Sequence, residues 1–190
     1  MTAEQIRANT YSLLATLLSA PPSAELRQRL LTIPAVKADE DSLAECWWLL
    51  KLAAEKVSVE ELDDEYHDLF IGVGHGELIP YSSHYLSGRI MEKPLALLRE
   101  DLVQLGFKTR PEVCETEDHV AALCEIMALM NNGPTIPRRR QRSFFEAHLS
   151  AWIVPFFRDL QKAPSARFYK AVGRLGQRFM EFEERYLSLP

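Results

Sequence analysis

The chain has 190 residues, of which 47% are hydrophobic, so it holds enough apolar material for one large or two small folded domains. Its net charge of −5 and its isoelectric point near 5.6 argue against nucleic acid as the main partner, because phosphate binding needs a basic face. A basic peptide is a compatible partner. The three cysteines, an odd number without a CxxC pair, fit a reducing compartment better than a disulfide framework.

The amino-terminal segment is a poor secretion signal, because Glu4 and Arg7 precede a short apolar run that has helical spacing. No uninterrupted apolar segment approaches the ~20 residues of a membrane span. We therefore expect a cytoplasmic protein without a membrane-spanning segment.

Apolar residues recur at helical spacing through the first half of the chain, and prolines, serines and glycines mark the helix ends. Pro21 and Pro22 end the first predicted helix, and Ser23 caps the second. Pro94 lies in the first turn of the fifth helix, which Gly106 ends. The predicted helices lie near residues 6–18, 23–32, 42–57, 58–70 and 94–105.

The predicted helix that follows Ser58 is strongly acidic. Ser58 and Glu61 form the capping-box pattern S-x-x-E at its start. Two interpretations of the acids stay open. They form a solvated face, since negative charge is favoured near a helix amino terminus, or they form a binding surface for a cationic ligand. The acidic residues are Glu60, Glu61, Asp63, Asp64, Glu65 and Asp68.

The helical pattern breaks in the stretch EYHDLFIGVGHGELIPYSSHY, residues 65–85. Three glycines fall within five residues, and a proline, hydroxyl groups and aromatic rings follow. A long loop that mixes glycine, histidine and tyrosine is more often functional than a spacer. We therefore expect a connecting loop whose far end, residues 81–85, is its working part.

Three further helices are predicted in the second half of the chain. Thr116 is expected to cap the first of them, Pro155 to kink the second or mark an irregular turn, and Pro164 to open the third. The basic segment 138–142 receives no assigned role. The predicted helices lie near residues 116–130, 141–161 and 164–186.

No segment alternates like a strand, and no heptad persists. The fold class is therefore all-α, a compact bundle of about eight to ten helices without a sheet. Residues 1–190 are expected to form a single domain, with a division into two lobes near residues 107–116 as the alternative.

Patterns for catalysis or metal binding are weak. HExxH and cysteine pairs at zinc spacing are absent. Adjacent helical residues point ~100° apart, so Asp118 and His119 are a poor chelating pair. The segment GVGHG lacks a preceding strand and a Walker lysine, and Ser82 and Ser83 lack a nucleophile elbow. An enzyme alternative, a metal-dependent helical phosphohydrolase, would use Asp118 and His119.

A binding surface is the interpretation that remains. If the fold brings the acidic fourth helix to the second acidic segment, residues 115–119, the two would form an acid-lined groove with aromatic walls. Arginine suits such a groove, because guanidinium groups pair with carboxylates through two hydrogen bonds and stack on rings.

Several segments resemble the TorD/DmsD/NarJ family of all-helical cytoplasmic chaperones for molybdoenzymes that are exported with a twin-arginine signal. Ile79 and Thr116 stand where the family pattern has proline. The tail FFEAHLSAWIVPFFRDL is similar to the family's H-L-x-x-W-x-x-x-F segment. The other matching segments are EYHDLFIG (65–72), IPYSSHY (79–85) and ETEDHVAALCEIM (115–127).

The resemblance implies a TorD-like, non-enzymatic chaperone that binds the twin-arginine signal peptide of an immature molybdoenzyme. It would assist cofactor insertion and assembly before export. The implied partners are the signal peptide and the apo catalytic subunit of a molybdopterin oxidoreductase, with no nucleic acid. No resident cofactor or metal is implied, although weak contact with guanine nucleotide or molybdenum cofactor fits the family. The implied state is a monomer that can form a domain-swapped dimer.

The resemblance also implies which residues bind the peptide. We expect Asp118→Ala to weaken binding without unfolding the protein. The predicted peptide-binding residues are Tyr81, Ser83, His84, Tyr85, Glu115, Asp118 and His119. Residues 81–85 are expected to face Asp118 and His119 across a groove.

Overall fold

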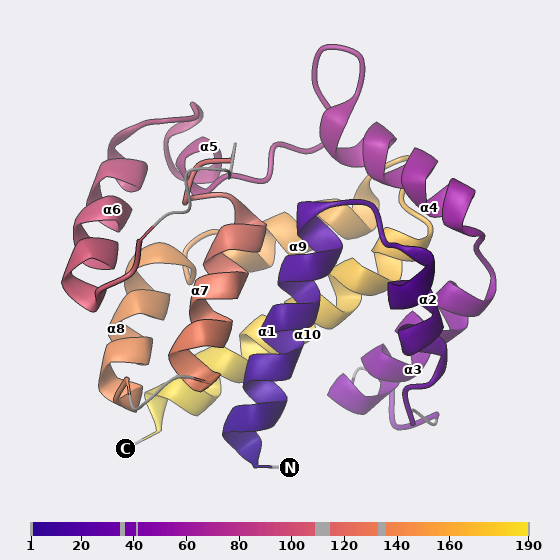
Figure 1. Cartoon of the computed structure of the whole chain (residues 1–190), viewed down its shortest axis with the longest axis horizontal. Coiled ribbons are helices and arrows are strands. Elements are labelled where there is room, and N and C mark those ends of the chain that lie inside the picture. Colours follow the sequence, from indigo (N-terminus) through magenta and orange to yellow (C-terminus); the bar gives the residue numbers. More distant parts are fainter. Residues whose placement is uncertain (1, 35–36, 41, 109–114, 133–135, 190) are drawn as a thin grey trace. The chain divides into compact units, whose positions relative to one another are not determined.

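The computed structural model describes residues 2–34, 37–40, 42–108, 115–132 and 136–189. Within these residues it contains ten α-helices, one π-helix and no strand, which confirms the all-α prediction (Figure 1). None of the helices in this described part is both long and apolar enough to cross a membrane. The elements are α1 (Ala3–Ser19), α2 (Ala24–Leu31), α3 (Leu43–Glu55), α4 (Val59–Tyr66), η1 (His67–Ile71), α5 (Ser82–Ser87), α6 (Lys93–Leu105), α7 (Val120–Asn132), α8 (Arg138–His148), α9 (Ile153–Lys162) and α10 (Phe168–Ser188).

The chain divides into two compact units. The first comprises Met1–Ser19, Pro80–Ile153 and Glu184–Pro190, and the second comprises Ala20–Ile79 and Val154–Glu183. The boundary predicted near residues 107–116 falls mostly on 109–114, which lie outside the described residues. The single-domain organisation and its two-lobe alternative stay predictions.

Helices α1 and α7 form the centre of the first unit, where they pack against each other. Helix α7 also contacts α8, and α6 contacts both α5 and α8 (Figure 1). The core follows from the helical spacing of apolar residues, since one face of each helix is buried. Its fully buried members include Tyr11, Leu14, Leu17, Leu123, Met127 and Leu149.

A buried arginine joins three segments of the first unit. Arg7 of α1 is 2% exposed, and its Nη1 donates to Oε1 of Gln141 at 3.2 Å. Its guanidinium lies 4.4 Å from the ring centroid of Tyr186, within the range of a cation–π interaction. The segment 138–142, for which the sequence predicts no role, therefore supplies a core residue, Gln141.

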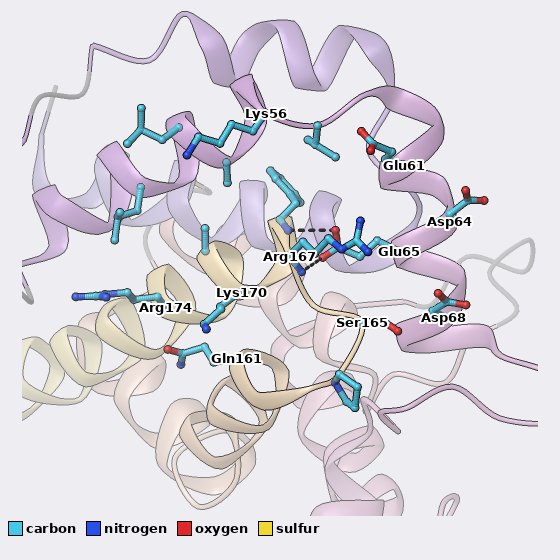
Figure 2. Close-up of a pocket in the computed structure, with 17 residues that line it drawn as sticks. Lys56, Glu61, Asp64, Glu65, Asp68, Gln161, Ser165, Arg167, Lys170 and Arg174 are labelled. Atoms are coloured by element: carbon cyan, nitrogen blue, oxygen red, sulfur yellow. Dashed lines mark hydrogen bonds between the residues drawn. The ribbon is translucent and has the colours of Figure 1, made fainter.

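The second unit depends on a buried carboxylate. Glu65 of α4 is 6% exposed, and it accepts three backbone N–H groups at the start of α10. The donors are Arg167 at 2.7 Å, Phe168 at 3.1 Å and Tyr169 at 2.8 Å, as the dashed lines in Figure 2 indicate. The first N–H groups of a helix have no partner within it, so Glu65 acts as the cap of a helix about 100 residues away.

Close packing in the second unit also requires a glycine. A Cβ atom at Gly176 of α10 would lie 2.2 Å from Cε1 of Phe157 on α9. The absence of a side chain therefore lets the Phe157 ring, which is fully buried, lie directly on the backbone of α10.

Several predicted helix ends are confirmed. The Ser23 side chain caps α2, and Ser58 and Glu61 form both hydrogen bonds of the capping box at α4. Pro94 lies in the first turn of α6, and Gly106, with a φ of 80°, ends that helix in the left-handed region.

Other predicted boundaries are wrong. Thr116 does not cap a helix, because α7 begins four residues later, and α10 begins at Phe168 rather than at Pro164. The single helix predicted over residues 141–161 is two helices, α8 and α9. Pro155 lies in the first turn of α9, where its missing N–H costs no hydrogen bond. The chain forms a turn at residues 149–152 just before it, which agrees with the predicted irregular turn rather than with a kink in one helix.

The loop predicted after the acidic helix holds more regular structure than expected, because the short helix α5 forms within it. The acidic helix, predicted near residues 58–70, is confirmed as α4 followed by the π-helix η1. Gly72 ends η1 with a φ of 57°, and its amide donates to the carbonyl of His67 at 2.7 Å. The start of α5 is capped by Asp118, a residue outside the loop.

Replacing Glu65 tests its capping role. We expect Glu65→Ala to lower the free energy of unfolding by about 2–4 kcal/mol, because buried N–H groups of α10 lose their acceptor. A urea titration monitored by circular dichroism measures the change. The exposed neighbour Asp64 provides the control, since Asp64→Ala should change stability by no more than about 0.5 kcal/mol. Equal effects of the two substitutions would contradict the capping role.

Candidate peptide-binding site

Two segments of the first unit meet at the predicted site. Tyr81 and His119 form an isolated antiparallel bridge. The amide of Ser82 donates to the carbonyl of Asp118 at 2.9 Å, and the amide of Val120 donates to the carbonyl of Pro80 at 2.8 Å. The predicted juxtaposition of residues 81–85 with Asp118 and His119 is confirmed. The segments are hydrogen-bonded directly, rather than facing each other across a groove.

Asp118 holds this contact together from inside the unit. Its side chain is fully buried, and Oδ2 accepts hydrogen bonds from the amide of Ser83 at 3.1 Å and from Oγ of Ser83 at 2.5 Å. The other oxygen, Oδ1, accepts the Thr116 hydroxyl at 2.5 Å. Ser83 is the second residue of α5, so Asp118 caps a helix that lies 35 residues earlier in the chain. This explains why α5 forms in a segment without strong helical spacing.

His119 is held in its neutral form. Its imidazole is 7% exposed, and burial lowers its pKa below the ordinary value of 6.5, although Glu115 and Asp118 act in the opposite direction. The Nδ1 atom accepts the amide of Ala121 at 3.2 Å, which also requires that this nitrogen carry no proton. The Tyr81 ring packs edge to face against the imidazole, with 5.0 Å between the two ring centroids.

The accessible part of the site is a rim around this buried contact. Glu115 is exposed, and its Oε2 accepts the hydroxyl of Tyr81. Tyr81, His84 and Tyr85 are half-buried. The Tyr85 ring lies 5.5 Å from that of Trp152 and 5.7 Å from that of His84. Of the seven predicted residues, four are therefore accessible, whereas Ser83, Asp118 and His119 are buried.

Sequence reasoning missed three residues that organise this rim. Arg99 of α6 pairs with Glu117 at 2.9 Å, and Thr116 bonds to Asp118 rather than capping a helix. Trp152 contacts Tyr85, and its Nε1 donates to the carbonyl of His148 at 2.7 Å. Trp152 and Thr116 lie in segments that match the family motifs, whereas Arg99 carried no signal in the sequence.

The acidic face of α4 belongs to the second unit, whereas residues 115–119 belong to the first. The acid-lined groove that combines them stays a prediction. Within the first unit, Glu115 is the acidic residue of the rim whose side chain is exposed.

The chemistry of Asp118 does not suit a metal. Both carboxylate oxygens accept hydrogen bonds from hydroxyl or amide groups of the same unit, and the side chain is sealed from solvent. In the described ranges, no three histidine, cysteine, aspartate or glutamate side chains converge as a metal site would require.

Comparison with known proteins identifies the family. A sequence model described as nitrate reductase delta subunit matches residues 36–158. The chain belongs to the nitrate reductase delta subunit family. This confirms the resemblance to the TorD/DmsD/NarJ chaperones, whose matching segments lie largely within the same range.

The relatives of the chain are named chaperones, not enzymes. The chain is 26% identical to "Chaperone protein TorD" of Histophilus somni over 125 residues, which is 65% of this chain and 64% of that protein. It is 27% identical to the protein of the same name from Shewanella loihica, over 92% of this chain and 90% of that one.

A solved structure shares the fold. The crystal structure of a putative redox enzyme maturation protein from Archaeoglobus fulgidus superposes with a TM-score of 0.65 at 17% identity. The superposition covers 95% of each chain. The two proteins therefore share a fold over nearly their whole length.

The burial of Asp118 changes the expectation for its replacement. We now expect Asp118→Ala to lower the free energy of unfolding by about 2–3 kcal/mol, because the buried Ser83 amide loses its acceptor. Glu125→Ala, an exposed position on α7, is the control and should change stability by no more than about 0.5 kcal/mol. Unfolding in urea gives both values. An Asp118→Ala protein as stable as the parent would show that the cap is unimportant.

Proposed function

We propose that this protein is a cytoplasmic maturation chaperone that binds the twin-arginine signal peptide of an immature redox enzyme. Binding would hold back export until the molybdenum cofactor has been inserted into the enzyme. Family membership and the chaperone names of the relatives support this proposal. The observation that carries it is the rim of Glu115, Tyr81 and Tyr85, an exposed carboxylate beside accessible aromatic rings.

Glu115 is the proposed acceptor for an arginine of the signal. One of its oxygens already accepts the Tyr81 hydroxyl, which fixes the carboxylate on the rim. A carboxylate has further acceptor positions, and a guanidinium donates to it through two parallel N–H groups. Tyr81, His84 and Tyr85 would contact the apolar residues that follow the arginines, since aromatic side chains bury much area at interfaces.

The buried residues have a different role in this proposal. Ser83, Asp118 and His119 would act by positioning, because their side chains are hydrogen-bonded within the unit and are not accessible to a peptide. Loss of Asp118 would then weaken peptide binding indirectly, by releasing α5 and with it Tyr85 and His84. In this proposal, four of the seven predicted residues contact the peptide, and the other three position them.

The proposed client is the apo catalytic subunit of a molybdopterin oxidoreductase. The proposal includes no catalytic step and no resident cofactor. It also involves no nucleic acid, in keeping with the net charge of −5.

Fluorescence anisotropy with a labelled twin-arginine signal peptide tests the proposal. We expect the parent protein to bind the peptide, and replacement of both arginines by alanine to weaken binding by roughly tenfold or more, because charge-assisted hydrogen bonds are lost. Glu115→Gln should weaken binding about two- to fivefold, as expected for one exposed charge pair. The matched control Glu125→Gln, on α7 of the same unit, should bind like the parent.

Two outcomes would contradict the proposal. Equal affinity for the arginine and alanine peptides would exclude recognition of the twin-arginine signal. Equal affinity of Glu115→Gln and Glu125→Gln for the arginine peptide would show that the arginines bind elsewhere.

A further inference from the structure

The second unit contains a cleft that the proposed function does not use. It has a volume of about 770 Å³, within the ~300–1,000 Å³ range typical of ligand sites. Its walls come from α3, α4, the connection between α9 and α10, and the first turns of α10 (Figure 2). All lining residues belong to the second unit, so the cleft is a feature of that unit alone.

One wall of the cleft is acidic. Glu61, Asp64 and Asp68 lie on α4 and η1 at spacings of three and four residues, which places them on one face (Figure 2). All three are exposed. Among the described residues, the carboxylates of Asp64 and Asp68 have neither a hydrogen bond nor an ion pair.

The opposite wall is basic. Figure 2 shows Lys56, at the end of α3, and Lys170 and Arg174, on α10, across the cleft from the α4 carboxylates. Arg174 pairs with Glu45 at 3.0 Å, outside the cleft lining. Lys56 and Lys170 are exposed, and no ion pair joins either lysine to the acidic wall in the described part of the chain. The cleft therefore has carboxylates on its α4 side and lysines on its α3 and α10 side, and the exposed Arg167, which also lines it, lies beside Glu65 between them (Figure 2).

Apolar residues form the surface between the two walls. Leu49, Leu52 and Ala53 share one face of α3, and Phe168 and Ala171 contribute from α10. The three α3 residues are half-buried, so they remain accessible from the cleft. Burial of such surface contributes to affinity, whereas the charges fix the orientation of a ligand.

Hydrogen bonds within the unit fix the elements that form the cleft, so the cleft exists without a ligand. Glu65 ties α4 to the start of α10 through three backbone hydrogen bonds. The Ser165 hydroxyl donates to Glu77 at 2.6 Å, which fixes the connection between α9 and α10. A cleft that is already formed loses less conformational entropy when a ligand binds.

We propose that this cleft binds a peptide segment of mixed charge. Basic side chains of the segment would face Asp64 and Asp68, acidic side chains would face Lys56 and Lys170, and apolar side chains would lie on α3. Ligands of a single sign fit less well, because a polyphosphate would meet the α4 carboxylates and a purely basic peptide would meet the lysines. The cleft belongs to the second unit and the rim around Glu115 to the first, so the cleft would add a second contact for a polypeptide.

Synthetic peptides of defined charge test this proposal. The first is a labelled leucine- and alanine-based peptide of about ten residues, with two arginines near one end and two glutamates near the other. Two comparison peptides carry glutamine in place of either the arginines or the glutamates. In fluorescence anisotropy at low salt, we expect the mixed-charge peptide to bind at least about fivefold more tightly than either comparison peptide, and this advantage to shrink at high salt.

Variants of the two walls assign the binding to the cleft. Asp64→Asn and Lys170→Gln should each weaken binding of the mixed-charge peptide about two- to fivefold. Asp64→Asn should not change the affinity for the peptide that lacks arginines. If Asp64 pairs directly with a peptide arginine, a double-mutant cycle requires this result. Asp63→Asn and Lys162→Gln are the matched controls, since both positions are exposed in the second unit but do not line the cleft. They should bind like the parent, and so should Glu115→Gln.

Several results would overturn the proposal. Equal affinity for all three peptides, or equal weakening by the lining and control variants, would exclude recognition by the two walls. Weakening by Glu115→Gln would place the peptide at the first site instead. A free arginine–glutamate dipeptide could also displace the labelled peptide as effectively as the unlabelled full peptide does. That result would show that the cleft binds a small zwitterion and not a peptide segment.

Discussion

Each unit of this protein depends on one buried carboxylate that caps a helix from a distant part of the chain. In the first unit, Asp118 accepts the Ser83 amide and hydroxyl and so defines the start of α5. In the second, Glu65 accepts three amides at the start of α10. A buried charge is costly unless it is fully hydrogen-bonded, and a helix amino terminus supplies unpaired donors together with a favourable dipole. The same interaction therefore satisfies the carboxylate and fixes the position of the helix.

This constraint separates residues that support the surface from residues that can touch a ligand. The two acids that cap helices, Asp118 and Glu65, are buried, and their oxygens accept hydrogen bonds from those helices. Their exposed neighbours, Glu115 in the first unit and Asp64 in the second, are the acids that can contact a ligand. A matching motif thus identifies the right segment, but burial decides which of its residues binds and which one holds the segment in place.

Local signals in the sequence were sufficient for most helices. Helical spacing, the Ser58–Glu61 capping box and Gly106 each act within a few residues, so they predict elements correctly. Glu65 could not be distinguished from five other acids of its helix, because its partner lies about 100 residues further along the chain. Helix α5 was missed for the same reason, since its cap is Asp118. The pairing of residues 81–85 with Asp118 and His119 was predictable only through the family motifs, which carry information about contacts that spacing does not.

The position at which the arginine pair of a signal peptide binds decides whether the rim is the signal-binding surface. Photo-crosslinking measures this when a twin-arginine peptide carries benzoylphenylalanine next to the arginines and the adducts are mapped by mass spectrometry. We predict adducts on residues 81–85 and 115–117, with none on the buried Asp118. Adducts confined to other segments, with residues 81–85 and 115–117 unmodified, would contradict the assignment of the rim as the signal-binding surface.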